Sequence, residues 1–272
     1  MSIRGPDSFK TYPEYIIFQN FRQSMIISSI ILRRHTILSE PEWKSIPWFL
    51  YPDSKTEMQF LYDIFADCPD LFVHKQEIES NPSPYDRSIE YAKLRQSVYD
   101  VICQLNQWKQ DWDVSNIGCS YEVPAPVTTP SIVNFYGRSV PAWETVIEYK
   151  SLYHANVVTV FNGIMILVEL LADELAFSGE LQWEQNSFPG QKFAAGMEIC
   201  RSIEYHLESM RKGAGSFFLL FPLRMAYDAI GKGNPTIGTW LQNVLQQIQD
   251  GQSGRWATAK YLLDIKPRQK KK

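Results

Sequence analysis

Apolar residues recur three and four positions apart along most of the chain, a spacing that places them on one face of a helix. Residues 86–110 show this pattern most clearly, with polar residues on the opposite side of the predicted helix. Its apolar face is formed by Tyr91, Leu94, Val98, Ile102, Leu105 and Trp108. Residues 13–38 begin with Pro13 in a first-turn position and predict a second helix. A shorter helix is predicted over residues 58–65, and the chain is expected to leave it at Pro69.

The longest periodic stretch covers residues 143–177. Its middle is apolar nearly all round, which predicts a central helix surrounded by other helices. Four further helices are expected, each bounded by Gly or Pro, at about 190–211, 214–230, 235–250 and 253–264. Pro222 falls inside one of them and is expected to kink or restart it.

Residues 113–140 contain several Gly and Pro residues and have no period, so they predict a long loop or an internal boundary. No alternation of apolar and polar residues lasts long enough to predict a sheet. The predicted fold class is therefore all-α, a multi-helix array around the helix of residues 143–177. We expect a single helical domain over residues 1–265, followed by a basic tail at residues 266–272.

Composition narrows the class of protein. The chain has 272 residues and is 44% hydrophobic, which is enough apolar mass for a substantial core. Its formal net charge is −3, whereas a domain that grips nucleic acid is usually basic on one face. The charge balance therefore argues against direct DNA binding by the helical body.

Two apolar-rich stretches resemble membrane spans only in part. Residues 15–32 are interrupted by polar residues that include Arg22, and residues 157–172 contain Asn162 and Glu169. A bilayer span needs roughly 20 mostly apolar residues, so both stretches are predicted to be core helices of a soluble protein with no membrane partner. The N-terminus has no apolar leader, which favours a reducing compartment and isolated buried thiols at Cys68, Cys103, Cys119 and Cys200.

The acidic and histidine residues predict neither a metal site nor a cofactor. No two of the four histidines lie four residues apart, and no HExxH frame is present. Asp173-Glu174 is an acidic pair, but no aspartate follows one helical turn later, so a solvated helix end is expected. Asp111 and Asp113 are interpreted as a surface turn after the helix of residues 86–110.

Three places in the sequence have a catalytic or ligand-binding interpretation as an alternative to a structural one. His154 is predicted to be a hydrogen-bonded core or rim histidine, with a buried acid/base as the alternative. Ser202 and His206 lie one helical turn apart after Cys200. A Cys/His nucleophile pair also needs a third group that orients the histidine, and the sequence shows none. The Gly213-Ala-Gly215 turn lacks the strand and the lysine of a phosphate loop, so an ordinary helix–helix turn is expected.

The eight tryptophans are spread along the chain and predict core packing. A cavity between helices, bounded by Trp143, Phe161 and Phe221, is the alternative interpretation, although no polar residue identifies a ligand for it. Such a cavity would suit a metal-independent enzyme of a fungal secondary-metabolite pathway. Because no polar residue identifies a ligand, we expect no enzyme activity. The metal-independent enzyme remains the second hypothesis.

The tail is the one concentrated charge feature of the sequence. Five of its seven residues are basic: Lys266, Arg268, Lys270, Lys271 and Lys272. A short basic run of this kind is either a nuclear address or a merely solvated terminus. The first interpretation predicts a nuclear protein with a cytoplasmic pool.

Several stretches in a particular order resemble the C-terminal regulatory region of fungal zinc-cluster transcription factors. In the first half these are residues 33–48, residues 61–69 and residues 91–108. In the second half they are residues 191–207, 217–227, 240–248 and 253–263. Each stretch alone is only apolar and helical, and the order of all of them together carries the resemblance.

The resemblance implies regulation of transcription, in the setting of a biosynthetic gene cluster. The DNA-binding part of that family is a six-cysteine zinc cluster, and this chain has no cysteine before Cys68. The family resemblance therefore implies action through contacts with a protein partner, either a full-length factor or a coregulator, without direct DNA binding. A small-molecule effector is a further option that the sequence does not identify.

Overall fold

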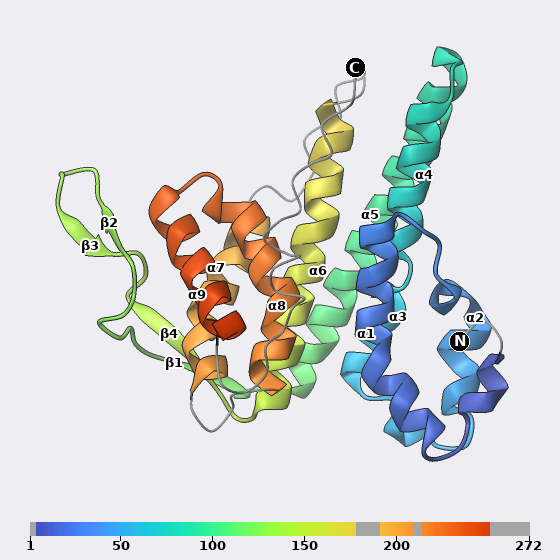
Figure 1. The fold of residues 1–272 in the computed structure, drawn as a ribbon, viewed down its shortest axis with the longest axis horizontal. Helices are drawn as coiled ribbons and strands as arrows, with labels where there is room; N and C mark the ends of the chain where they lie inside the picture. Colours follow the sequence, from blue (N-terminus) through green and yellow to red (C-terminus); the bar gives the residue numbers. More distant parts are fainter. Residues whose placement is uncertain (1–3, 178–190, 209–213, 251–272) are drawn as a thin grey trace. The chain divides into compact units, whose positions relative to one another are not determined.

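The computed structural model describes residues 4–177, 191–208 and 214–250, and these fold predominantly into helices with a few short strands (Figure 1). The predicted all-α class is confirmed, as is a long apolar helix that packs against several others. The chain divides into two compact units. Unit 1 comprises residues 1–115 and 171–184, and unit 2 comprises residues 116–170 and 185–272. The single-domain organisation of residues 1–265 stays a prediction.

Unit 1 is built from helices joined by short 3-10 turns. Its helices are α1 (Glu14–Leu32), α2 (Pro41–Ser45), α3 (Glu57–Phe65), α4 (Cys68–Ser80) and α5 (Pro84–Ser115). The helices predicted near residues 58–65 and 86–110 are confirmed as α3 and α5. The first predicted helix is shorter than expected, because α1 ends where Arg33 takes a left-handed conformation with φ 52°.

Two expectations for unit 1 are wrong. Pro69 does not lead the chain out of a helix, because it lies in the first turn of α4, where its missing N–H costs no hydrogen bond. Asp111 and Asp113 do not form a turn, because α5 continues to Ser115. Trp112 between them is buried, and this burial accounts for the extension of the helix beyond residue 110.

The core of unit 1 is rich in aromatic residues around the buried face of α1. Phe18 is fully buried, with its ring centre 5.8 Å from that of Trp43 and 5.9 Å from that of Trp48. The ring of Phe9 packs against those of Phe18 and Trp43, with its centre 5.5 Å and 5.7 Å from theirs. These aromatic side chains supply large apolar areas for burial, so tryptophan as core packing is confirmed for Trp43 and Trp48.

Unit 2 begins with strands that the sequence pattern did not predict. Residues 120–149 contain β1 (Ser120–Pro124), β2 (Ser131–Val133), β3 (Ser139–Pro141) and β4 (Thr145–Tyr149). β1 pairs antiparallel with β4, from Ser120 opposite Tyr149 to Pro124 opposite Thr145. β2 pairs antiparallel with β3. The predictions of a long loop over residues 113–140 and of no sheet are therefore wrong, whereas the alternative of an internal boundary agrees with the division between units 1 and 2 after Ser115.

The reason for this error is visible in the burial of the strands. Val146, Ile147 and Tyr149 of β4 are buried without a regular alternation, and most of β1 is exposed. Neither strand therefore shows the period of two that marks a half-buried strand. The central helix α6 (Leu152–Phe177) accordingly begins nine residues later than the predicted start at residue 143.

The α6 helix has the length and apolarity of a membrane span. Over Leu152–Ala176 its mean hydropathy reaches 1.9, and among the described residues it is the one such candidate. However, 83% of that window is buried inside the protein, as expected for the central helix of a folded core.

The remaining helices of unit 2 follow the Gly and Pro boundaries read from the sequence. They are α7 (Gln191–Leu207), α8 (Ala214–Ala226), a π-helical turn (Tyr227–Gly231) and α9 (Pro235–Asp250). Pro222 does not restart α8, which continues through it. A Cβ atom placed on Gly163 of α6 would lie 3.3 Å from the Cα of Pro222. The helices α6 and α8 therefore pack closely at this proline. The helix predicted at residues 253–264 lies outside the described residues.

Candidate functional site

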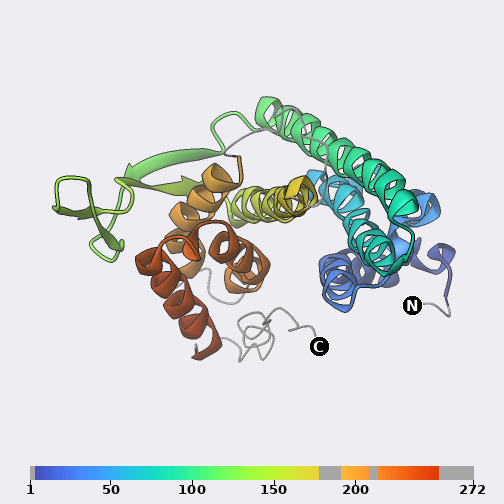
Figure 2. The ribbon, with the colours of Figure 1, turned by 90° about the horizontal axis from the view of Figure 1, so that it is seen from above.

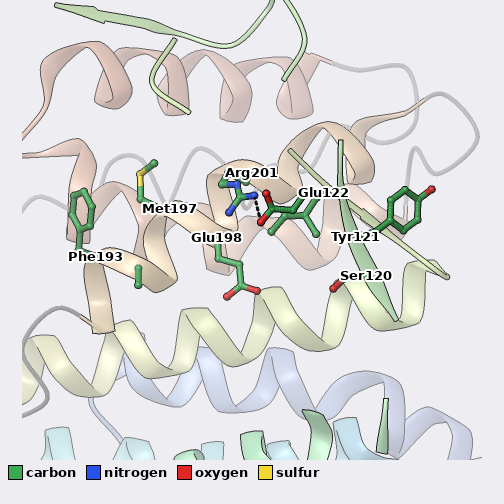
Figure 3. Close-up of a pocket in the computed structure, with 9 residues that line it drawn as sticks. Ser120, Tyr121, Glu122, Phe193, Met197, Glu198 and Arg201 are labelled. Atoms are coloured by element: carbon green, nitrogen blue, oxygen red, sulfur yellow. Dashed lines mark ion pairs between the residues drawn. The ribbon is translucent and has the colours of Figure 1, made fainter. Parts of the chain in front are cut away.

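The main hollow of interest in unit 2 lies between β1 and the helix α7 (Figure 3). We call it the β1–α7 groove, and its volume is about 650 Å³. Its lining residues are Ser120, Tyr121, Glu122, Ile147, Phe193, Ala194, Met197, Glu198 and Arg201. Figure 3 shows Phe193 and Met197 beside each other on α7, with the Arg201–Glu122 pair farther along the helix. The groove therefore has an apolar end and a charged end.

The charged end is held together by the guanidinium group of Arg201, which we call the arginine fork. Arg201 Nε donates to the backbone oxygen of Thr145 at 2.8 Å, and Nη2 donates to Thr145 Oγ1 at 2.7 Å. Nη2 also lies 2.7 Å from Glu122 Oε1, and Thr145 Oγ1 donates to Glu122 Oε2 at 2.7 Å. The hydrogen bonds from Arg201 and Thr145 lower the pKa of Glu122 below its usual range. This network fixes α7 to the β1–β4 ribbon.

The floor beside the groove is closed by buried hydrogen bonds. Tyr149 and Ser202 share a hydrogen bond of 2.6 Å between their hydroxyl oxygens, and Ser202 Oγ also reaches the backbone oxygen of Glu198 at 2.7 Å. The Glu198 carboxylate accepts from Asn162 Nδ2 of α6 at 3.0 Å. Burial, followed by the nearby charge of Glu198, raises the pKa of Tyr149, so its phenol stays protonated at neutral pH.

The β2–β3 hairpin extends from the same ribbon and projects beyond the helices of unit 2 (Figures 1 and 2). Its base is tied to the ribbon by hydrogen bonds from Ala125 N to Glu144 O at 2.9 Å and from Ala142 N to Pro130 O at 2.8 Å. Thr128 Oγ1 also donates to Glu204 of α7 at 2.9 Å. The hairpin is thus a structured extension of the fold.

The tip of this hairpin, residues 134–138, carries two adjacent aromatic rings in solvent. Phe135 is 97% exposed and Tyr136 is 82% exposed. The turn is built by Asn134, whose Oδ1 accepts from the backbone N–H groups of Tyr136 and Arg138, both at 3.0 Å. Gly137 takes φ 73°, which a residue with a side chain rarely adopts. These two hydrogen bonds and the Gly137 conformation define the turn at the tip.

A second hollow, of about 520 Å³, lies in unit 1 between α3 and α5. Trp108 and Trp112 stack along its wall with ring centres 5.7 Å apart, and Trp108 Nε1 donates to the backbone oxygen of Glu57 at 3.1 Å. Asp63, which also lines it, is engaged by Arg22 and Lys55. Trp108 and Asp63 in its wall therefore have structural partners.

His154, Ser202 and His206 have local structural partners. His154 Nδ1 lies 2.7 Å from Ser151 Oγ, one turn away at the start of α6. His206 is fully buried, and its Nδ1 lies 2.9 Å from the backbone oxygen of Ser202, so Nδ1 carries the proton. Ser202 Oγ meets Tyr149 rather than the His206 ring. Cys200 is buried, and its burial raises the pKa of the thiol well above the usual range.

The rings expected to bound a cavity are themselves buried. Trp143 packs edge-on against Trp240 with ring centres 5.1 Å apart. Phe161 and Phe221 are both buried, and a Cβ at Gly163 would meet the Phe221 ring at 2.9 Å. The three side chains are thus packed into the core of unit 2.

Carboxylates and cysteines in the described part of the chain do not gather into a metal site. Glu174, expected at a solvated helix end, pairs with Lys75. All four cysteines are free, as predicted, but Cys103 is exposed and Cys119 is half-buried, so the prediction of uniformly buried thiols is wrong. Gly213, Trp183, Trp256 and the basic residues Lys266, Arg268, Lys270, Lys271 and Lys272 lie outside the described residues.

Sequence reasoning missed the groove and the hairpin tip. A signal for the tip is present, because Asn134 and Gly137 are turn residues that lie between Ile132-Val133 and Val140, as is typical of a hairpin. No local signal exists for the Arg201 fork, because Thr145 lies 56 residues away in the sequence.

Comparisons of the chain with protein-family models, with curated protein sequences and with solved structures find no match. The resemblance to fungal zinc-cluster factors therefore stays a prediction.

Proposed function

We propose that this chain regulates transcription in the nucleus by binding another protein through unit 2, without reading DNA itself. The observation that carries the proposal is the hairpin tip, where Phe135 and Tyr136 are held almost fully exposed on a hydrogen-bonded turn. The order of stretches that resembles fungal zinc-cluster regulatory regions supports the transcriptional part, as an expectation from sequence.

The exposure of these rings favours a binding role because aromatic surface in water is costly. Burying apolar surface contributes roughly 25 cal/mol per Å², and a Phe or Tyr side chain offers about 150–250 Å². A turn that is already ordered loses little further entropy when its rings enter a partner. Burial of the tip in a partner would therefore release much free energy and cost little conformational entropy, as is typical of residues that dominate an interface.

The charge of the chain favours a protein partner over DNA. The formal net charge is −3, and the β1–α7 groove has two carboxylates, Glu122 and Glu198, against one arginine. Phosphate backbones attract surfaces rich in Lys and Arg, so an acidic groove beside the hairpin does not suit DNA. A full-length transcription factor or a coregulator is the kind of partner that we propose.

A tethering experiment tests this function. The chain is fused to an unrelated DNA-binding domain above a reporter gene in a fungal cell, and reporter output is compared with that of the DNA-binding domain alone. We expect output to change several-fold with the native chain. The double variant Phe135→Ser/Tyr136→Ser should return output to the level of the DNA-binding domain alone, because it removes the anchor.

The matched control is Phe49→Ser/Tyr85→Ser, which removes one exposed Phe and one exposed Tyr from unit 1. This variant should act like the native chain. An unchanged reporter with the native fusion, at a normal nuclear level of the protein, contradicts the proposal. Equal loss in both double variants contradicts the role of the hairpin tip.

A further inference from the structure

We infer that the hairpin tip of one copy of this chain inserts into the β1–α7 groove of a second copy, and that the second copy returns its own tip. The inference rests on the proposed function, in which unit 2 binds protein through the hairpin tip, and it adds a second copy of this chain as a binding partner of that tip. The juxtaposition that motivates it is an exposed aromatic tip on the β2–β3 hairpin and a groove beside β1 of the neighbouring β1–β4 ribbon, both in unit 2.

The apolar end of the groove matches the rings of the tip. Phe193 is 59% exposed at this end, beside Ala194 and Met197. Methionine and phenylalanine side chains make favourable contacts with aromatic rings. The groove volume of about 650 Å³ is of the size that encloses a drug-sized group, so it can receive the paired rings of Phe135 and Tyr136.

The charges are also complementary. The groove contains Glu122 and Glu198 against Arg201, so two negative charges meet one positive charge and leave one carboxylate in excess. The tip carries Arg138, which is exposed. When the aromatic rings enter the apolar end, Arg138 brings the positive charge that the groove lacks. Opposite charges at an interface suppress wrong partners and set the orientation.

The arm points away from its own groove. Figures 1 and 2 show the β2–β3 hairpin projecting beyond α7 and α9, whereas the groove lies between β1 and α7. A tip that projects from the body and a groove beside the ribbon from which the hairpin extends fit a two-fold exchange. In such an exchange each copy uses the same two surfaces, so the assembly closes as a dimer and does not grow into a filament.

The area is adequate for a stable pair. Two exchanged tips bring four aromatic rings, each of about 150–250 Å², and thus about 600–1,000 Å² of ring surface. The groove walls that cover them lose a similar area. The total is then about 1,200–2,000 Å², which is the size of a standard specific interface.

Sedimentation equilibrium of the purified full chain tests the inference. We expect a monomer–dimer equilibrium for the native chain. Phe135→Ser/Tyr136→Ser should raise the dissociation constant at least about 30-fold, as loss of an interface hot spot does. Phe193→Ser on the groove side should also weaken the dimer, while the control Phe49→Ser/Tyr85→Ser should not. Circular dichroism confirms that each variant is folded.

A mixing experiment tests the contact itself. One variant carries Tyr136→Cys and another carries Phe193→Cys, both in a Cys103→Ser/Cys119→Ser background that removes the two thiols that are not buried. A short bismaleimide should join the two variants efficiently in a mixture. A mixture of Tyr85→Cys with Phe193→Cys should give only background cross-linking.

Three results would overturn the exchange: a monomer at all concentrations, a dimer that survives the tip variant, or cross-linking no better than the Tyr85→Cys control. The proposed function fails separately. If the reporter responds to loss of the tip but not to Phe193→Ser, and no dimer forms, then the tip binds a different protein and only the exchange is wrong.

Discussion

At the scale of single residues, the most telling side chain is Arg22. In the sequence it interrupts an apolar stretch, yet in the structure it is fully buried within unit 1. Its Nη1 donates to Gln59 O at 3.0 Å and its Nη2 to Asp63 Oδ1 at 2.5 Å, and Lys55 Nζ lies 2.6 Å from Asp63 Oδ2. Burial lowers the pKa of Arg22, although the nearby Asp63 opposes this shift. The arginine is thus a charged connection between α1 and α3.

Replacing Arg22 with methionine should destabilise the protein strongly. The change removes the buried hydrogen bonds of Arg22 to Gln59 and Asp63, while Asp63 keeps Lys55, so the cost should lie near the lower end of the about 3–5 kcal/mol for breaking a buried ion pair. We expect a loss of that order in the free energy of unfolding, measured by urea denaturation. Lys93→Met is the control, because the Lys93–Glu90 pair is on the surface, where such pairs contribute about 1 kcal/mol or less. Equal losses in the two variants would contradict the structural role of Arg22.

The carboxyl group of Glu122 offers a test of the groove geometry. Hydrogen bonds from Arg201 and Thr145 lower its pKa in the folded chain below the ordinary value of 4.5. Its interaction therefore stabilises the fold above that ordinary value and is lost as the pH falls through the lower, folded pKa. NMR titration of the Glu122 carboxyl carbon should show this low value. In Arg201→Gln the pKa of Glu122 should move back up, and an unchanged titration would contradict the arginine fork.

At the scale of elements, helix positions follow local pattern and helix ends follow backbone chemistry. α3, α7 and α9 begin and end close to the expected residues, and for α7 and α9 the boundaries follow Gly or Pro in the sequence. The exceptions arise where packing acts on an element. α8 continues through Pro222, and β4 occupies residues that were expected to begin the central helix.

The contact between α9 and the π-helical turn depends on a missing side chain. A Cβ at Gly238 would lie 2.5 Å from the backbone oxygen of Gly231, which is closer than real atoms approach. Gly238→Ala should therefore destabilise the protein by about 1–3 kcal/mol, since strain from overpacking outweighs the helix propensity gained. Thermal or urea unfolding measures the change.

Gly233→Ala is the matched control for this element. The nearest atom to a Cβ at Gly233 is the Ile230 backbone oxygen at 3.9 Å, an ordinary contact distance. This variant should leave the free energy of unfolding nearly unchanged. If Gly238→Ala proved equally neutral, the close approach of α9 to the turn would be wrong.

At the scale of the whole molecule, the distribution of charge carries the localisation hypothesis. The chain has a net charge of −3, yet its last seven residues hold five basic residues. Such a concentration at one end suits recognition by an import receptor, which reads a short basic run.

Neutralising that end should reduce nuclear accumulation. We predict that replacing Lys266, Arg268, Lys270, Lys271 and Lys272 with glutamine lowers the nuclear-to-cytoplasmic ratio of a large fluorescent fusion in a fungal cell. Replacement of the same lysines with arginine keeps the charge and should preserve the ratio. If the glutamine variant accumulated normally, the tail would be only a solvated terminus.

Much of the helical fold could be predicted from local spacing, because a helix that buries one face must repeat apolar residues every three or four positions. The β1–β4 ribbon could not, since β4 is buried without alternation and β1 is mostly exposed. The hairpin tip was partly readable from Asn134 and Gly137, but the exposure of the aromatic rings between them was not.

The sequence by itself determined that this chain is a mostly helical protein with a long apolar helix, because periodicity and Gly or Pro boundaries are local properties. Only the tertiary structure decided which polar groups meet. Arg22 reaches Asp63 across 41 residues, and Arg201 reaches Thr145 across 56. A local pattern records which side of an element is apolar, but the partner of a charge is chosen by packing between segments that are distant in the chain. The groove and its facing aromatic tip belong to this second kind of information.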